Sequence, residues 1–372
     1  MNLYSELSKQ WNSRPEDERF CNTAEMYADA VEDKRATGTV VVALKDCSVI
    51  CDDVGGAPIL IGPGGAEAVT NNWSYQQLCQ RAEAPAGYLR DLSCDLRSRC
   101  LNEGLQRSGE SARLMLTKTD TDRYALRAAT SETYGYVHDS DIIRQIRMFV
   151  GNGDGTDSDW RVPTPFKRAG DSKEHVEVTP QTATLFRGDR DSYGFLVNEK
   201  MGIEISKRRN GDNGLANLGF YWQHSMVGKC GWEIGVMLYD YVCSNYNVWG
   251  AELLKQVKFR HSKNINLRWQ QSVQDVIEAD FESARLEVEQ LIARAQAKRI
   301  GTSEDVLKLL GKHFTSKQTE AIVLQHNAEE HRPIETIWDA NVGATAYAKL
   351  APYRGDRIEI EGKASKILAL AA

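Results

Sequence analysis

The sequence predicts an α+β protein with a central antiparallel sheet, packed helices and a helical C-terminal third. Between residues 183 and 205, apolar side chains recur at strand spacing around two turns. After residue 270 they recur at helical spacing. A chain of 372 residues, of which 41% are apolar, supplies one large core or two modest domains. The apolar strand residues are Leu185, Tyr193, Phe195, Val197, Ile203 and Ile205.

The first 150 residues divide into an arm and a mixed α/β region. Residues 1–36 form the arm, which is charged and weakly helical, with Asn22-Thr23 placed to cap a helix. Residues 37–150 open with a run of β-branched side chains, which favours a small sheet. The further elements expected there are a strand at 59–61, helices at 74–82 and 86–106, a hairpin at 113–129 and a helix at 141–150.

Residues 151–269 are predicted to hold the central antiparallel sheet and a basic segment. The region opens with GNGDGTDSD, residues 151–159, whose composition indicates an internal boundary or a mobile loop. Its aspartates also invite a calcium interpretation. An EF-hand loop needs a closing bidentate Glu and flanking paired helices, which this stretch lacks, so a solvated turn is favoured.

Residues 270–372 are predicted to be a helical C-terminal region. One long helix is expected over 270–298, where the apolar stripe is too short as a heptad repeat to favour a coiled coil over core packing. Thr302 or Ser303 is placed to cap a second helix and Thr315 a third. A last helix is expected over 335–350, followed by a tail that docks or frays.

Charge and cysteine usage limit the class of protein. The formal net charge of -6 and the pI near 5.8 argue against coating nucleic acid through overall charge, so any such site must be a local basic patch. Eight cysteines without an N-terminal secretory signal predict free structural thiols in a reducing cytoplasm. The sequence contains no run of about 18 apolar residues, so no membrane span is predicted. Cys47 and Cys51 have no second ligand pair, so no metal or cofactor is predicted.

The candidate site is a surface for a single strand of nucleic acid. Such a surface needs cations along the phosphates and rings that stack on bases. Between Glu252 and Asp275 the chain has no acid but several cations. The predicted phosphate contacts are Lys207, Arg208, Arg209, Lys255, Lys258, Arg260, Lys263 and Arg268, and the predicted stacking rings are Tyr221, Trp222, Phe259 and Trp269. The competing interpretation places these cations on solvated faces and these rings in the core.

Catalytic interpretations have weaker support. The glycine cluster at 62–65 lacks the Gly-Lys-Ser/Thr ending of a phosphate-binding loop. A nucleophile pair would need Cys243 beside His224 or His261, and spacing along the chain does not establish that contact. Local ion pairing around Arg190 is favoured over a two-metal centre built from Asp189, Asp191 and Glu199. No catalytic residue is predicted, and a binding protein is favoured over an enzyme.

Several stretches together resemble a family of uncharacterised proteins encoded by phages and plasmids. The stretches are WSYQQLCQRAEAPAGYL, YALRAATSETYGYVHDSDII, DYVCSNYNVWG with RHSKN after it, and TIWDANVGATAYAKL, in that order over roughly residues 70–350. Members of the family often have Gly where this chain has Tyr246, which puts in doubt a tight turn after Asn245. The resemblance implies a mobile-element protein of the bacterial cytoplasm.

The predicted function is therefore single-stranded nucleic-acid binding in phage or plasmid DNA metabolism, with single-stranded DNA as the partner. The helix-hairpin-strand-helix order over 139–250 is similar to that of Rad52-like strand-annealing proteins, which assemble into rings. This similarity makes a homo-oligomer possible. The alternatives are a non-catalytic oligomeric interaction protein of a phage and a metal-dependent nuclease.

Overall fold

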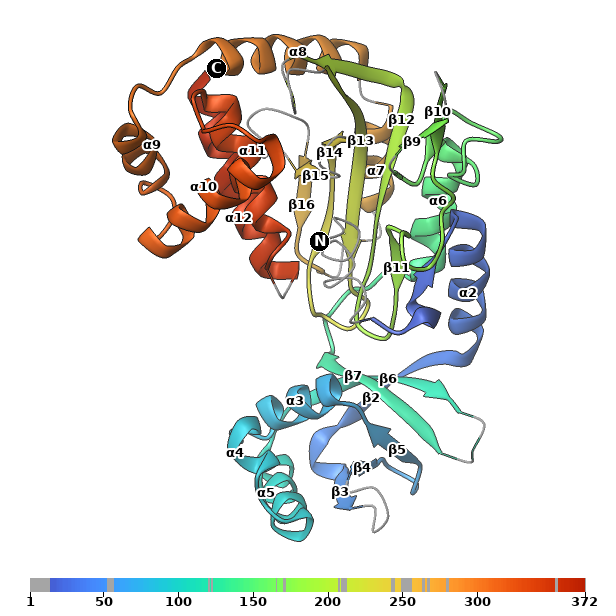
Figure 1. The fold of residues 1–372 in the computed structure, drawn as a ribbon. Coiled ribbons are helices and arrows are strands. Elements are labelled where there is room, and N and C mark those ends of the chain that lie inside the picture. The colour runs from blue at the N-terminus through green and yellow to red at the C-terminus, as the bar shows by residue number, and fades with distance from the viewer. Residues whose placement is uncertain are drawn as a thin grey trace.

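The computed structural model describes residues 14–51, 57–119, 121, 123–164, 166–169, 172–206, 208, 213–241, 245–248, 256–262, 265, 268–278, 281–351 and 354–371. Its described part has two lobes, a small one with a six-stranded sheet and a large one with an eight-stranded sheet (Figure 1). Helices cover both sheets and dominate the C-terminal region, which confirms the predicted α+β class. Among the described helices, none has the length and apolar character needed to cross a membrane.

The small lobe is a curled sheet with strand order β2-β6-β7-β5-β4-β3, in which only β5 and β7 run parallel. Its core consists mostly of aliphatic residues between positions 42 and 129, together with Tyr75, Cys47 and Cys79, packed under α3 and α5. The 113–129 hairpin is confirmed as β6 and β7. The strands are β2 (Thr37–Ala43), β3 (Ser48–Cys51), β4 (Pro58–Ile61), β5 (Glu67–Thr70), β6 (Ser111–Lys118) and β7 (Tyr124–Ser131). The helices are η2 (Leu44–Asp46), α3 (Asn72–Arg81), α4 (Ala86–Arg90) and α5 (Cys94–Arg107).

The large lobe is built on a sheet with the order β1-β11-β12-β13-β14-β15, to which β8 and β16 add at β12 and β14. The longest strands, β12 to β14, form an antiparallel meander, as predicted for the central region. The strands are β1 (Arg19–Phe20), β8 (Trp160–Arg161), β11 (Leu185–Arg187), β12 (Ser192–Ile205), β13 (Gly214–His224), β14 (Trp232–Asp240), β15 (Asn245–Val248) and β16 (Gln256–Phe259), with β9 (Phe166–Ala169) and β10 (Ser172–His175) pairing separately.

Helices pack around this sheet. η1 (Glu16–Glu18), α2 (Thr23–Ala36) and α6 (Asp139–Val150) precede it in the chain, and α2 packs on α6 and β11. α8 (Phe281–Ala297) crosses the end of β12, and the later helices lie beside β15 (Figure 1). The remaining helices are α7 (Trp269–Ile277), α9 (Ser303–Leu310), α10 (Ser316–Glu330), α11 (Ile337–Ala348), α12 (Arg354–Leu368) and η5 (Ala369–Ala371).

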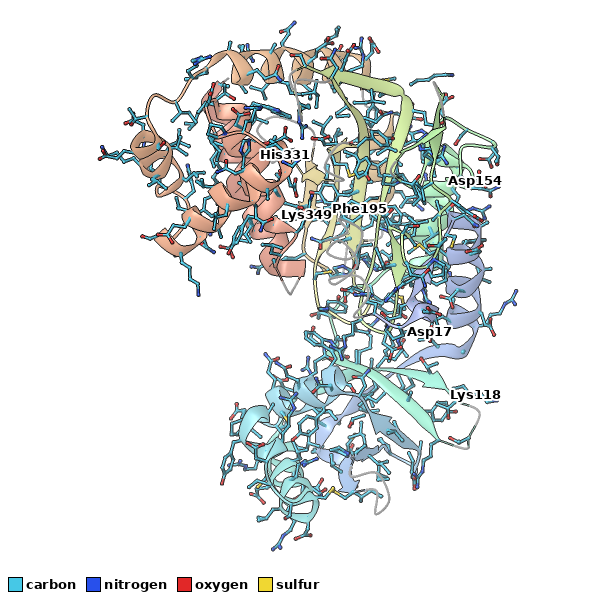
Figure 2. All side chains as sticks on the ribbon, in the orientation of Figure 1. Asp17, Lys118, Asp154, Phe195, His331 and Lys349 are labelled. Atoms are coloured by element: carbon cyan, nitrogen blue, oxygen red, sulfur yellow. A yellow bond between two sulfur atoms is a disulfide. The ribbon has the colours of Figure 1, made fainter. Side chains whose placement is uncertain are left out.

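The two faces of the large sheet bury different side chains. One face contributes Leu196, Phe220 and Trp222 to a core that continues through α6, α7 and α8 into the C-terminal helices. The other face carries a smaller cluster rich in tyrosine and phenylalanine, including Tyr239 and Phe195. Figure 2 labels Phe195 among the side chains of the large lobe. Burial on both faces is the reason that β13 and β14 read as nearly continuous apolar runs.

Several local predictions are confirmed by capping contacts. The side chain of Asn22 accepts a hydrogen bond from the backbone N–H of Glu25 at the start of α2. Thr302 and Thr315 do the same for Asp305 and Gln318 at α9 and α10, each in a capping box. These positions follow from local chemistry, which explains why the sequence alone located them.

Other predictions were wrong. The expected single helix over 270–298 is two helices, because α7 ends at Ile277 and α8 begins at Phe281. The expected helix over 86–106 is likewise divided into α4 and α5. The segment 151–159, predicted as an internal boundary or a mobile loop, contacts α2 at its first residue, where Gly151 accepts a hydrogen bond from Thr23, and that prediction stays open. Cys51 and Cys94 form a disulfide between β3 and α5, where free thiols were expected.

Candidate nucleic-acid interface in the interlobe cleft

The two basic stretches identified in the sequence lie at opposite ends of β14. Arg208 contacts Asp240 at the last residue of that strand, whereas Lys258 contacts Glu233 near its first residue. Asp240 is seven residues beyond Glu233, so at about 3.3 Å per residue the two lie about 23 Å apart along the strand. The described residues of the two stretches therefore do not form one groove wall.

Arg208 is in the interior. Only 1% of it is exposed, and its guanidinium is paired with Asp240 and, at 2.7 Å, with Glu330 of α10. Two carboxylates neutralise it, so the expectation that Arg208 contacts a phosphate was wrong. The predicted cations Lys207, Arg209, Lys255 and Lys263 lie outside the described residues.

Three of the four predicted stacking rings are also buried. Tyr221 and Trp222 are 5% and 1% exposed on opposite faces of the large sheet, and Trp269 is 4% exposed at the start of α7. The hydroxyl of Tyr221 donates a hydrogen bond to Glu233 at 2.8 Å. The prediction that these rings stack on bases was therefore wrong, because the core takes them instead.

The remaining predicted residues cluster near the junction of the lobes. Phe259 is half-buried, and the guanidinium of Arg268 lies 5.2 Å from the centre of its ring. Lys258, Arg260 and Arg268 are exposed, although Lys258 is paired with Glu233 at 2.8 Å. The segment after β16 packs directly on the linker between the lobes: a methyl group added at Gly135 would meet the carbonyl oxygen of Ser262 at 2.0 Å.

A cleft of about 850 Å³ opens at this junction. We call it the interlobe cleft. One wall belongs to the small lobe, at β2 and β6, and the other to α6 and α7 of the large lobe. The linker from β7 to α6 forms the floor between them. The lining residues are Val41, Arg113, Glu132, Thr133, Tyr134, Gly135, Tyr136, Val137, His138, Asp141, Arg144, Trp269 and Gln270.

Two arginines on opposite walls keep their charge available. Arg113 of β6 is half-buried and donates to the backbone carbonyl of Glu132 at 2.8 Å, and its buried Nε has no hydrogen-bond partner among the described residues. Arg144 of α6 has 63% of its side chain exposed, and its closest recorded carboxylate, that of Asp141, is 4.0 Å away. Asp141 itself binds Lys34 at 2.8 Å. Among the residues that the structure describes, neither arginine is neutralised by a close carboxylate in the way that Arg208 is.

Aromatic rings alternate along the floor. Tyr134, Tyr136 and His138 occupy every second position and are all half-buried. Tyr134 is fixed by a 3.1 Å hydrogen bond to the carbonyl of Ser225, while Tyr136 meets His138 edge to face at 5.3 Å. The floor therefore presents aromatic edges and faces between two cationic walls, which is the combination that an unpaired strand requires.

Neutral histidines support this floor from below. The ring of His261 stacks on Tyr134 at 5.4 Å and on His224 at 4.7 Å. Burial lowers the pKa of His224 to about 4, and burial together with neighbouring His224 lowers the pKa of His261 to about 3. Nε2 of His224 lies 2.8 Å from the carbonyl of Val137, which suits a neutral ring donating from that nitrogen.

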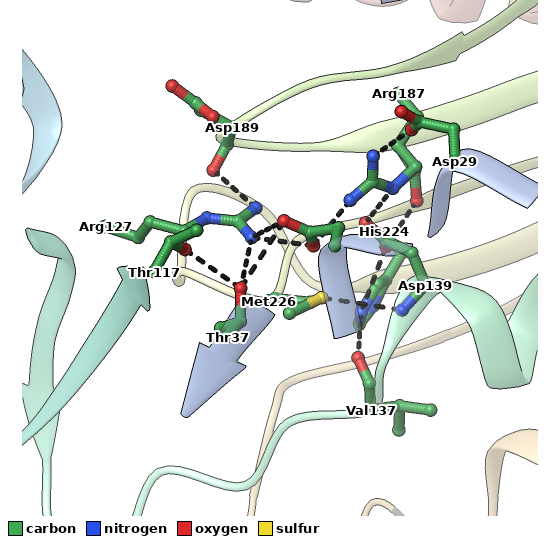
Figure 3. A network of polar contacts seen from close by, with 12 residues as sticks. Asp29, Thr37, Thr117, Arg127, Val137, Asp139, Arg187, Asp189, His224 and Met226 are labelled. Carbon is green, nitrogen blue, oxygen red and sulfur yellow. Dashed lines mark hydrogen bonds and ion pairs between the residues drawn. The ribbon is translucent and has the colours of Figure 1, made fainter. Parts of the chain in front are cut away.

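An ion-pair network joins the two lobes beside the cleft (Figure 3). Arg127 of β7 binds Asp33 of α2 at 2.8 Å and donates to the carbonyl of Asp189 at 3.2 Å. Arg187 of β11 also binds Asp33, at 2.5 Å, and pairs with Asp139 at 3.3 Å. Burial alone would raise the pKa of Asp33, but Arg127 and Arg187 lower it. These contacts connect β7 of the small lobe to α2 and to the segment after β11 of the large lobe.

The catalytic candidates are engaged in structural contacts. Asp191 pairs with Arg14 and, at 3.2 Å, with Lys229. Glu199 pairs with Arg161 at 2.8 Å. Cys243 lies outside the described residues, which contain no group of three or more Asp, Glu, His or Cys side chains able to hold a metal ion.

No family model, curated protein or solved structure matches this chain. The function of the protein is therefore inferred from the geometry of the interlobe cleft. Sequence reasoning missed Arg113, Arg144, Tyr134 and Tyr136, although one signal was present: rings at every second position in TYGYVH form one row in an extended linker.

Proposed function

We propose that this protein binds single-stranded nucleic acid in the interlobe cleft. The observation that carries the proposal is the placement of Arg113 and Arg144 on opposite walls above a floor of alternating rings. Arginine pairs with phosphate oxygens through two parallel hydrogen bonds, so one wall or both can hold the backbone. The rings of Tyr136 and His138 then lie where bases would stack.

An unpaired strand fits this site better than a duplex. Stacking on a protein ring requires bases that are not already stacked and paired within a helix. The exposed cations Arg260 and Arg268 extend the positive surface from the cleft along the segment after β16. A strand leaving the cleft could therefore continue over residues that the sequence had already suggested.

We further propose a role in phage or plasmid DNA metabolism, including strand annealing. Two observations support this finer assignment. In the described residues α6 precedes the β12-β13-β14 meander, and the next helix after it, α7, begins at Trp269, later than the helix expected before residue 250. Its motifs also resemble those of the phage and plasmid family. Annealing of complementary strands is the direct assay for this role.

Fluorescence anisotropy with a labelled oligodeoxythymidine tests the binding proposal. We expect the double variant Arg113→Glu/Arg144→Glu to lose at least tenfold in affinity at low salt, because reversed charges repel phosphate. The matched control is Arg99→Glu/Arg299→Glu, which makes the same charge change at side chains 76% and 79% exposed outside the cleft. Equal losses in both variants would show that only net charge matters and would overturn the cleft assignment.

Replacement of a floor ring separates stacking from charge. Tyr136→Ala is expected to weaken binding by about 1–3 kcal/mol, the usual contribution of one stacked base. Tyr136→Phe keeps the ring and should bind like the wild type. If Tyr136→Ala binds as tightly as the wild type while Arg113 and Arg144 are still required, the strand contacts the cleft walls and does not stack on the floor.

A further inference from the structure

Strand β2 is an uncovered edge of the small sheet. In the described part of the chain it pairs only with β6, so its other side has no strand beside it. Residues 38–41 are all exposed, and Val40 and Val41 are 43% and 44% exposed. Two neighbouring valines at this exposure on an edge strand leave both apolar surface and backbone groups in water.

The register shows which backbone groups point outward. The N–H of Leu44 donates to the carbonyl of Glu110 at 3.1 Å, which makes these residues a hydrogen-bonded pair. Hydrogen-bonded and non-hydrogen-bonded pairs alternate along an antiparallel ladder, and the register from Val42 to Thr37 is unbroken. Val40 therefore bonds to β6, whereas Thr39 and Val41 direct their N–H and C=O groups away from the sheet.

The strand also has none of the features that prevent edge pairing. Sheet edges are usually protected by lysine, proline, a bulge or a covering element. The sequence TGTVVVA has no charge and no proline, and its pairing with β6 shows no register shift. This edge can therefore accept another strand.

We propose that β2 pairs antiparallel with β2 of a second copy of this chain, about a two-fold axis at Val40. Centred there, the seven-residue strands align end to end, with Thr39 of each copy opposite Val41 of the other. The outward-pointing groups then meet in hydrogen-bonded pairs. A strand with no charge suits pairing with itself, because a charged residue near the axis would face a like charge.

The paired strand would also enlarge the interlobe cleft. Val41 is both an outward-pointing edge residue and part of the cleft wall. The second copy would therefore place its Thr39 beside that wall and extend it. The pairing does not depend on nucleic acid, so it can be tested without any ligand.

Sedimentation velocity over a range of protein concentrations measures the association. The wild type is expected to shift from monomer to dimer as concentration rises, whereas Val41→Lys should remain a monomer. Ile50→Lys is the matched control, since Ile50 is 43% exposed on β3 at the opposite edge of the same sheet. It should dimerise like the wild type. A wild type that stays monomeric, or equal loss of the dimer in both variants, would overturn the proposal.

Disulfide trapping tests the register of the paired strands directly. Unlike Val41→Lys, it does not depend on weakening the dimer. Val40 would face its own copy in a non-hydrogen-bonded pair, where Cα atoms lie about 4.5 Å apart, within the range of a disulfide. Val40→Cys in a Cys100→Ser background, which removes an exposed thiol, should give a covalent dimer under mild oxidation. Ile50→Cys in the same background should not. Failure of Val40→Cys to cross-link while the protein is dimeric would place the interface elsewhere.

Discussion

Arg208 and Arg144 have the same side chain, but the first is buried and the second is exposed. Arg208, which follows β12, is 1% exposed beside the last residue of β14, and both of its carboxylate partners are buried with it. Arg144 lies on the interlobe cleft with 63% of its side chain exposed and Asp141 4.0 Å away. The first guanidinium satisfies charges inside the fold, and the second remains available to a ligand.

The comparison shows why a run of cations is a poor guide to a binding surface. Arg208 belongs to the most basic stretch of the sequence, yet its partners, 32 and 122 residues away, neutralise it. Arg113 and Arg144 stand alone in the sequence and become neighbours of one cleft only through the packing of the two lobes. Availability depends on tertiary partners, and local composition does not reveal them.

The largest expected effect is on the buried Arg208 and its two carboxylates. Arg208→Ala should lower the free energy of unfolding by about 3–5 kcal/mol, because Asp240 and Glu330 would stay buried while losing the guanidinium that compensates their charge. Urea unfolding measures it. Arg299→Ala, at a side chain 79% exposed, is the control and should change stability little. A loss below about 1 kcal/mol for Arg208→Ala would mean that the buried cluster is not held by this charge.

Acid should weaken the support beneath the cleft floor. The folded-state pKa of His224, about 4, lies below its ordinary value of 6.5 because of burial. Stability from the neutral ring is therefore complete above about pH 6.5 and is lost as pH falls toward 4, by on the order of 3 kcal/mol in total. Thermal unfolding between these pH values measures the loss.

His261→Phe separates the contribution of the stack. The variant keeps an aromatic ring between Tyr134 and His224 but cannot be protonated. It should reduce the dependence of the melting temperature on pH without changing the fold. The same steep dependence in His261→Phe would assign the acid sensitivity to His224 alone or to other groups, such as the carboxylates around Arg187.

The smallest expected effect on stability is at the cleft. Arg144→Ala should change the free energy of unfolding by no more than about 0.5 kcal/mol, since exposed ion pairs contribute little. The same variant should nevertheless weaken binding of a single strand. Urea unfolding and anisotropy on one preparation test both statements. A variant that loses several kcal/mol of stability would show that Arg144 is structural, as Arg208 is.

Features that depend on residues close together in the chain could be predicted from the sequence. The caps at Asn22, Thr302 and Thr315 and the β6-β7 hairpin follow from neighbours a few residues apart. The prediction failed where distant segments decide. Trp222 and Trp269 were as suitable for stacking as for packing, and only the covering helices placed them in the core. The cleft depends on the angle between two lobes, which no local pattern encodes.

The salt dependence of binding tests the central claim most directly. For single strands, log Kd should change with log salt concentration by about 0.7 for each phosphate contacted. If Arg113 and Arg144 each hold one phosphate, Arg113→Gln/Arg144→Gln should lower that slope by about 1.4 relative to the wild type. Arg99→Gln/Arg299→Gln should leave it unchanged. A wild-type slope retained in the cleft variant would contradict the assignment of the interlobe cleft as the nucleic-acid site.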